Sequence, residues 1–235
     1  MRLLTVALLG ACLLAPAMAG DMAHMDGGIA FVGTNALVPT GILPPPPAND
    51  SFETTEELKS LHQIAADATN TQVAAALADS KNETVFLFAP AIDANFTALQ
   101  FPATAALFKK IAVDGEIYER MAKQTWQRPR PYVFDKSLIP ACGASKKPSF
   151  SYPSGHAIEV WTQGTVLAAL LPSHAAAIKV RAANYAFERE ICGAHYSSDL
   201  AAGHLLGVIL ADKILASAEF QREATAARDE LARVK

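Results

Sequence analysis

The sequence carries little charge and no excess of either sign. Charged residues make up 18% of the chain, and the formal net charge is −3. Proteins that bind a nucleic-acid polymer usually have a basic surplus, which is missing here. The hydrophobic fraction of 51% is too high for a disordered chain, and 235 residues suit one domain. We therefore expect a globular protein whose partners do not include a nucleic-acid polymer.

Long apolar runs are also lacking, except for one at the very start. Arg2 precedes the apolar stretch 3–14, and an Ala-x-Ala cleavage site ends at Ala19, which is typical of a signal peptide. We predict a signal peptide over residues 1–19 and a periplasmic or secreted protein that is free of the membrane after cleavage. The stretch is shorter than the roughly 20 residues of a membrane span. An uncleaved anchor and lipidation at Cys12 are the alternatives.

Cysteine is scarce, with three residues, one of which lies in the predicted signal peptide. The remaining pair, Cys142 and Cys192, would form one disulfide in an oxidising compartment. It would close a loop of about 50 residues and contribute roughly 3–4 kcal/mol to the free energy of unfolding. Two buried thiols are the alternative.

Strand signals are almost absent, which predicts an all-α fold in the form of a single-domain helical bundle. Residues 20–50 have no clear periodicity and include the run Pro44–Pro47, so we expect an extended N-terminal arm before a domain over 51–235. Proline and glycine interrupt the helical patterns, and Ser173 is a candidate N-cap. The helices are expected over 51–67, around 74–78, and over 111–126, 156–171, 174–190, 197–218 and from 219 onward, with 131–153 as a loop.

The first candidate cluster is basic and ends a predicted helix. Lys123 is followed after six residues by Arg130 and Pro131, and Arg128 adds a third cation. Cations at this position can bind an anion. They can equally be an ordinary basic helix C-terminus that complements the helix dipole.

The second cluster begins an apolar helix. Ser154, Gly155 and His156 follow Tyr152-Pro153, so a tight turn leads directly into a helix N-terminus. Free N–H groups at such an end bind phosphate or a similar anion, and His156 adds a titratable group. An ordinary serine N-cap with an incidental histidine is the alternative.

The third cluster is Arg189, then His195 after five residues, then Asp199 after three more. If His195 and Asp199 share a helical turn, the carboxylate can bind one imidazole nitrogen and leave the other as a nucleophile. A surface ion pair and a metal pair are the alternatives. His204 is a poor further metal ligand, because a continuous helix would turn it to the opposite face from His195.

Together, the three clusters supply cations, a helix N-terminus, two histidines and a carboxylate. Phosphoryl transfer requires mainly positioning and neutralisation of charge on the phosphoryl oxygens, and arginine matches a tetrahedral oxyanion. The set could provide both without a metal, so we expect no cofactor.

The order and spacing of the clusters resemble the signature of the phosphatidic acid phosphatase type 2 and vanadium haloperoxidase superfamily, K-x6-RP, PSGH and SR-x5-H-x3-D. Every position matches except Glu188, which replaces the serine before Arg189. Within that superfamily the chain looks most like the class A bacterial non-specific acid phosphatases. They have a similar LPPPP run, here Leu43–Pro47, and a similar ICGxHxxSD stretch, here Ile191–Asp199.

The resemblance implies a role for each matching residue. His195 would attack phosphorus and form a phosphohistidine, Asp199 would orient His195, and His156 would protonate the leaving alcohol and later activate water. Phosphate oxygens would be held by the following residues: Lys123, Arg130, Ser154, Gly155 and Arg189. The family also implies an all-α fold, no metal, a homo-oligomer and small-molecule phosphomonoester substrates, with inorganic phosphate or vanadate as a ligand of the same pocket.

Three other functions fit parts of the pattern. A vanadium-dependent haloperoxidase would use the same pocket to hold vanadate. A membrane lipid phosphatase would need spanning helices, whereas the apolar stretches 156–171 and 200–216 are interrupted by charged or polar residues and are expected to be core helices. A phosphate-binding module without turnover is the non-enzymatic alternative. Candidates for stacking a ring of the substrate are Trp126, Tyr132 and Phe134, with core packing as the alternative.

Overall fold

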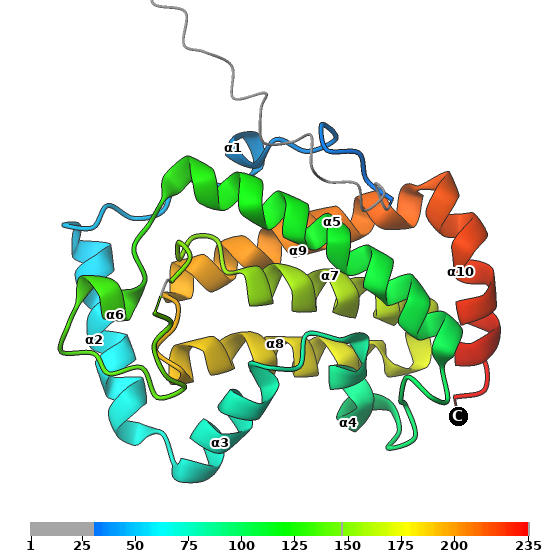
Figure 1. The fold of residues 1–235 in the computed structure, drawn as a ribbon, viewed down its shortest axis with the longest axis horizontal. Helices are drawn as coiled ribbons and strands as arrows, with labels where there is room; N and C mark the ends of the chain where they lie inside the picture. Colours follow the sequence, from blue (N-terminus) through cyan, green and yellow to red (C-terminus); the bar gives the residue numbers. More distant parts are fainter. Residues whose placement is uncertain (1–30, 147, 235) are drawn as a thin grey trace, which may run out of the picture.

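The computed structural model describes residues 31–146 and 148–234, and no β-strand occurs among them, so the predicted all-α fold is confirmed (Figure 1). The predicted signal peptide and residues 20–30 of the predicted arm lie outside the described residues. The α-helices are α1 (Pro39–Ile42), α2 (Phe52–Asp67), α3 (Asn70–Asp79), α4 (Ala89–Ile92), α5 (Pro102–Trp126), α6 (Pro131–Phe134), α7 (Gly155–Leu170), α8 (Ala175–Ile191), α9 (Ser197–Ala216) and α10 (Ala218–Leu231). Two short 3-10 helices, η2 (Val85–Phe88) and η3 (Pro172–His174), complete the set.

Helix α7 is the centre of the bundle. It packs against α9, α8 and α5, while α10 packs against α5 and α9 at one end (Figure 1). Helices α2 and α3 lie at the opposite end and contact α8. This arrangement places the N-termini of α7 and α9 near α2, in the part of the molecule where the sequence motifs meet.

Helices α7 and α9 approach closely because α9 presents two glycines to α7. A β-carbon on Gly203 would lie 2.7 Å from the β-carbon of Ala157, and one on Gly207 would lie 2.7 Å from the carbonyl oxygen of Ile158. No larger residue fits at these two positions without moving the helices apart. The close approach brings the first turns of both helices side by side.

Helix boundaries agree with the sequence at some ends and differ at others. Ser51 caps α2 as expected, with its Oγ accepting from the backbone N–H of Thr54 at 3.1 Å. Ser173 does not cap α8: the helix begins at Ala175, after the 3-10 turn that contains Ser173. Pro172 favours this turn, because its fixed φ suits the first position of a helical segment.

The described part of the N-terminal arm packs on the helical body. The ring of Phe31 meets the ring of Phe220 edge to face, with centroids 5.5 Å apart. The hydroxyl of Tyr118 donates to the carbonyl of Gly33 at 2.5 Å, and that of Tyr152 donates to the carbonyl of Pro44 at 2.6 Å. The arm also includes the short helix α1, which the sequence did not predict.

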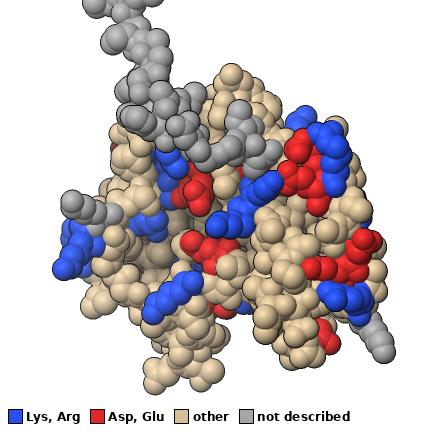
Figure 2. Space-filling view, turned by 45° about the vertical axis from the view of Figure 1, so that its right-hand side comes forward, with Lys and Arg blue, Asp and Glu red and all other residues tan. Residues whose placement is uncertain are grey.

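The surface drawn in Figure 2 carries acidic and basic side chains interspersed, in keeping with the small net charge. Within the described ranges, no single helix has the length and apolar composition to cross a membrane. In the part of the chain that the structure describes, one pair of helices, α9 and α10, has that length and composition when taken together, and the two are bent by 88° relative to each other.

Candidate active site

The site forms where the N-termini of α7 and α9 meet. The backbone N–H of Ser154, the N-cap of α7, donates to the carbonyl oxygen of Asp199 in the first turn of α9 at 3.0 Å. The second and third sequence clusters are therefore in direct contact. The hydroxyl of Ser154 is fully buried and accepts from the backbone N–H of Ala157 at 3.4 Å, so it caps its own helix.

His195 and Asp199 form the predicted pair in a different local structure. Nδ1 of His195 lies 3.3 Å from Oδ2 of Asp199, and both side chains are almost completely buried. His195 lies outside α9, just before its N-cap residue Tyr196. The same Oδ2 accepts from the backbone N–H of Tyr196 at 2.9 Å. The carboxylate thus contacts the histidine and caps the helix at once, and the two residues meet across the start of α9 and not within one helical turn.

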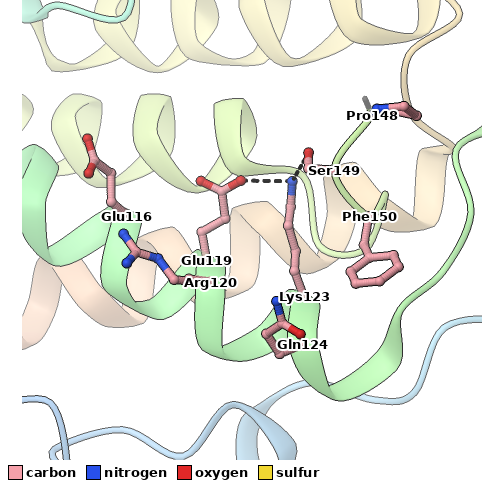
Figure 3. Close-up of a pocket in the computed structure, with 8 residues that line it drawn as sticks. All are labelled: Glu116, Glu119, Arg120, Lys123, Gln124, Pro148, Ser149 and Phe150. Carbon is pink, nitrogen blue, oxygen red and sulfur yellow. Dashed lines mark hydrogen bonds and ion pairs between the residues drawn. The ribbon is translucent and has the colours of Figure 1, made fainter. Parts of the chain in front are cut away.

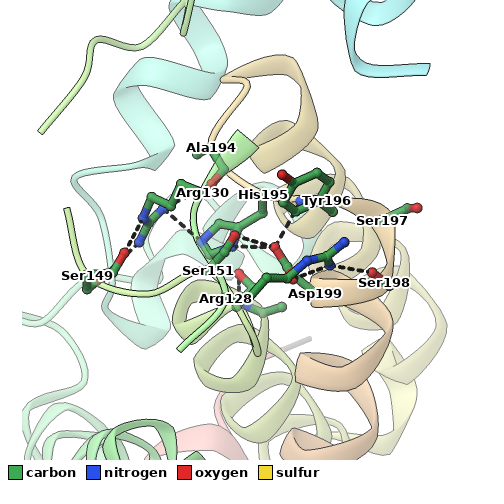
Figure 4. Close-up of polar contacts among 12 residues, drawn as sticks. Arg128, Arg130, Ser149, Ser151, Ala194, His195, Tyr196, Ser197, Ser198 and Asp199 are labelled. Atoms are coloured by element: carbon green, nitrogen blue, oxygen red, sulfur yellow. Dashed lines mark hydrogen bonds and ion pairs between the residues drawn. The ribbon is translucent and has the colours of Figure 1, made fainter. Parts of the chain in front are cut away.

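The hydrogen bonds assign the tautomer of His195. Nη1 of Arg130 lies 3.1 Å from Nε2 of His195, and a guanidinium can only donate. Nε2 is therefore the acceptor, and Nδ1 carries the proton toward Asp199. Burial, and then the positive charge of Arg130, lower the pKa of His195 to about 3. His195 is consequently neutral over the range in which an unperturbed histidine titrates. Its Nε2 lone pair is directed at Arg130 (Figure 4).

Two further residues hold Asp199. Nη1 of Arg128 donates to Oδ1 at 2.9 Å, and the hydroxyl of Ser151 donates to Oδ2 at 2.5 Å (Figure 4). Burial alone would raise the pKa of Asp199, but the hydrogen bond and charge of His195, with Arg128, lower it below its usual value. The sequence identified Arg128 only as an additional cation and did not identify Ser151.

Arg128 connects the pair to α2. Its guanidinium lies 3.7 Å from the ring centroid of Tyr196, and its Nη2 binds Oε2 of Glu57 at 2.8 Å. Oε1 of Glu57 accepts from the backbone N–H of Ser198 at 2.7 Å. Glu57 was not singled out in the sequence, because a glutamate near the start of α2 looks like a residue that favours the positive helix end.

A cleft of about 440 Å³ brings several predicted residues together, and one of them, Arg130, contacts His195. His195 itself is buried and does not line the cleft. The predicted residues in its lining are Arg130, His156 and Arg189. Ser149, which the sequence did not identify, also lines it and accepts from Nη2 of Arg130 at 3.0 Å. Basic side chains, a histidine and a hydroxyl around one cavity can bind a tetrahedral oxyanion.

His156 lies in the first turn of α7 with its Nε2 near two oxygens. Oε1 of Glu83 is 3.1 Å away, and the carbonyl oxygen of Ser80 is 3.4 Å away. Burial, followed by the charge of Arg189, lowers the pKa of His156 to about 4. A bound anion near the cations would raise this pKa, because it would offset their charge.

Lys123 lies beside the cleft and does not line it. Its Nζ lies 2.8 Å from Oε1 of Glu119 and 3.4 Å from Oγ of Ser149. Ser149 therefore links Lys123 to Arg130. Burial lowers the pKa of Lys123, whereas the charge of Glu119 opposes that shift.

Glu188, the departure from the family signature, lies between two arginines. Its carboxylate oxygens are 3.9 Å from Nη1 of Arg181 and 3.8 Å from Nη2 of Arg189. Nη2 of Arg189 donates at 2.9 Å to the carbonyl oxygen of Ala76. Burial, and then a hydrogen bond with Asp79, raise the pKa of Glu188 to about 7. Glu188 therefore makes only a long contact with Arg189.

The predicted disulfide is present between Cys142 and Cys192, with a sulfur–sulfur distance of 1.99 Å. Both cysteines line the cleft, as does Ala194. The bond joins the loop before α7 to the turn that carries His195. Among the candidate stacking residues, Tyr132 also lines the cleft, whereas Trp126 packs edge to face on Tyr152.

In the described part of the chain, no three histidine, cysteine, aspartate or glutamate side chains are grouped so that they could hold a metal ion. His204 stacks on Trp161 with ring centroids 3.7 Å apart. It is therefore engaged in an aromatic contact on α9.

The structure combines an all-α bundle with a buried His–Asp pair next to a basic cleft. Comparison with known sequences identifies the family. Residues 103–221 match the model of the PAP2 superfamily. The chain belongs to this superfamily.

Several curated relatives are similar over most of their length. The chain is 30% identical over 208 residues to the acid phosphatase of Zymomonas mobilis. The aligned region covers 82% of this chain and 75% of that phosphatase. It is 30% identical over 199 residues to the non-specific acid phosphatase of Salmonella typhimurium, covering 80% and 78%. The non-specific acid phosphatase of Providencia stuartii is 26% identical over 210 residues, covering 86% and 84%.

Among solved structures, a transmembrane PAP2 type phosphatidylglycerolphosphate phosphatase from Bacillus subtilis is similar to this chain, with a TM-score of 0.42 and 18% identity. The match covers 71% of this chain and 96% of that one.

Proposed function

We propose that this protein hydrolyses small-molecule phosphate monoesters through a phosphohistidine on His195, with His156 as the general acid and base. The chain is an acid phosphatase of the PAP2 superfamily. The observation that carries the finer proposal is the state of His195, which is buried and neutral, donates through Nδ1 to Asp199 and directs the Nε2 lone pair at Arg130.

The first step transfers the phosphoryl group to the protein. The phosphoryl oxygens bind Arg130, Arg189 and Lys123, and Arg130 turns from Nε2 of His195 to the ester. Nε2 attacks phosphorus, and the bond between phosphorus and the alcohol oxygen breaks. His156 gives its proton to that oxygen, so the alcohol leaves neutral. Asp199 stabilises the positive charge that develops on the imidazole of His195.

The second step releases phosphate. His156, now neutral, accepts a proton from water, and the hydroxide attacks phosphorus. The bond between Nε2 of His195 and phosphorus breaks, and its electron pair returns to the nitrogen. The balance of the two steps is ester plus water giving alcohol plus phosphate, with both histidines restored.

A trapping experiment tests the roles of the two histidines. The wild-type protein, His195→Ala and His156→Ala are mixed with a phosphorus-labelled aryl phosphate in EDTA and quenched in base, in which phosphohistidine is stable. We expect label on the wild type and none on His195→Ala. A labile aryl ester needs little acid assistance to leave, so His156→Ala should accumulate label because it cannot activate water. Turnover that survives His195→Ala, or bromide oxidation in place of ester hydrolysis, would contradict the proposal.

We also propose that the protein is exported and acts as a homo-oligomer in the periplasm or outside the cell. The Cys142–Cys192 disulfide supports an oxidising compartment, where such bonds persist. Cell fractionation and N-terminal sequencing test this, with Gly20 expected as the first residue. Sedimentation of the mature protein tests the oligomeric state.

A further inference from the structure

Lys123, one of the proposed phosphate ligands, is paired with a carboxylate. Its Nζ lies 2.8 Å from Oε1 of Glu119, one turn earlier on α5. The Lys123 side chain is only 8% exposed, and that of Glu119 is 30% exposed. This ion pair is therefore shielded from solvent on the lysine side and is not a freely solvated surface contact.

The same carboxylate lies against the start of α7. A β-carbon built on Gly155 would lie 2.2–2.4 Å from the carboxyl carbon and both carboxyl oxygens of Glu119. Gly155 is the first residue of a 16-residue helix, whose N-terminus attracts negative charge. Two independent sources of positive potential, Lys123 and this helix end, thus meet at the carboxylate of Glu119.

We propose that Glu119 is an internal competitor for phosphate at Lys123 and Gly155, and so sets how tightly the site holds the phosphoryl group. This inference rests on the proposed function, because it requires phosphate at the same two residues. A phosphoryl oxygen can approach Lys123 and Gly155 together only after the carboxylate has moved away. Part of the binding free energy is then spent on separating Glu119 from Lys123, which weakens retention of the product phosphate.

The structure provides space for the displaced side chain. Glu119 borders a cavity of about 340 Å³ next to the cleft, which shares Pro148 and Ser149 with it (Figure 3). Arg120 and Gln124 line the same cavity and offer new partners for the carboxylate. Glu119 can therefore leave Lys123 by turning its side chain, without any movement of α5.

Glu116 supplies a matched control. It is one turn from Glu119 on α5, has the same charge and lines the same cavity. No ion pair between Glu116 and Lys123 is present among the described residues. Glu116→Gln and Glu119→Gln each remove one negative charge from the cavity, so a difference between them reports the contact with Lys123 and Gly155.

The experiment is calorimetric titration of the full-length mature protein with inorganic phosphate at one fixed pH. Glu119→Gln should bind phosphate about three- to tenfold more tightly than wild type, the size expected for losing one partly shielded ion pair. Glu116→Gln should bind like wild type. Glu119→Ala is the second variant, because a glutamine amide oxygen can still accept from Lys123 and alanine cannot. Circular dichroism confirms that each variant is folded.

The outcomes separate this inference from the proposed function. Unchanged or weaker phosphate binding by both Glu119 variants would overturn the inference, since Glu119 would then only hold Lys123 in place. Equal tightening by Glu119→Gln and Glu116→Gln would also overturn it, as a general charge effect. Tightening confined to the Glu119 variants supports it even in a protein without turnover. If no variant binds phosphate, the proposed function and this inference both fail.

Discussion

The guanidinium of Arg128 binds Asp199 and Glu57 at the same time, through Nη1 at 2.9 Å and Nη2 at 2.8 Å. Arg128 is 2% exposed and Asp199 is fully buried. One arginine therefore pairs with two carboxylates, one of which contacts His195. The His195–Asp199 pair is connected to α2 through this arginine, although α2 contributes no residue to the cleft lining.

Replacing Arg128 tests that dependence. Arg128→Met should lower the free energy of unfolding by about 3–5 kcal/mol, because it leaves Asp199 without its buried cation. It should also lower kcat. Denaturant unfolding and steady-state kinetics measure both effects. Arg128→Lys keeps the charge but lacks the planar fork, so its losses should be smaller. A methionine variant as stable and active as wild type would contradict this role.

Ser151→Ala tests the positioning of Asp199 without removing a charge. The hydroxyl donates to Oδ2 of Asp199 at 2.5 Å, so its loss allows the carboxylate to shift relative to His195. We expect kcat to fall about tenfold with little change in KM, and stability to fall by about 1 kcal/mol. Ser198→Ala is the control, because that hydroxyl binds Arg128 and not Asp199. Equal effects of the two substitutions would exclude a specific role for Ser151.

The two histidines of the phosphate-free protein should each contribute less stability as the pH falls below about 6.5, whereas buried carboxyls such as Glu159, whose pKa is raised to about 8, shift stability in the opposite direction. The native pKa values of His195 and His156 are lowered to about 3 and about 4 from 6.5. Between those values each histidine binds a proton more readily in the unfolded chain than in the native protein, so its contribution to stability rises with pH. The loss on acidification should be on the order of a few kcal/mol. The loss contributed by each histidine begins near pH 6.5 and ends at about pH 4 for His156 and about pH 3 for His195.

Denaturant unfolding at a series of pH values measures this effect. The lowered pKa of Asp199 adds a further loss below its ordinary value of 3.8. His195→Gln removes one of the two histidines, so between pH 6.5 and 4 the wild type should lose more stability, or gain less, than this variant. An identical pH dependence of the two proteins would show that His195 gains a proton as readily in the native protein as in the unfolded chain.

The disulfide should stabilise the protein and keep the cleft aligned. Replacing Cys142 and Cys192 together by serine should cost roughly 3–4 kcal/mol, the value expected for a loop of about 50 residues. Activity should fall as well, because Cys192 is three residues from His195. Reduction of the wild-type protein is the comparison and should give the same loss. Two free thiols in the unfolded, unreduced protein would contradict the bond.

Glu188→Ser restores the residue of the family signature and should have a modest effect. The carboxylate is 3.8 Å from Arg189, and its pKa of about 7 leaves it partly protonated at neutral pH. We expect a KM for substrate lower by no more than about threefold. Unchanged KM and kcat would remove Glu188 from any account of phosphate binding.

The sequence predicted the parts of the site that depend on short spacing. His195 and Asp199, four apart, are in contact, and Ser154 begins the helix expected of it. The local structure of the pair was not predictable from spacing alone, because residues i and i+4 can also meet across a helix start. There, Asp199 accepts from the backbone N–H of Tyr196.

The contacts that the sequence did not predict join residues that are far apart along the chain. Glu57 and Arg128 are in contact across 71 residues, and Lys123 and Ser149 across 26. Neither pair follows a periodic pattern, so only the packing of α2 and of the loop before α7 brings them together. Glu119 was missed for the opposite reason, since a glutamate one turn before Lys123 looks like a routine surface ion pair on a helix.

The region matched by the superfamily model is shorter than the set of residues that hold the candidate site together. The region that matches the superfamily, residues 103–221, begins after the segment that holds Phe31, Pro44 and Glu57. Pro44 accepts from Tyr152, the residue before the catalytic turn, and Glu57 binds Arg128. A gene fragment trimmed to the matched region would therefore retain every residue of the candidate site named from the sequence and lose the contacts that Pro44 makes with Tyr152 and Glu57 makes with Arg128. Engineering or crystallising this enzyme should start from the longer segment.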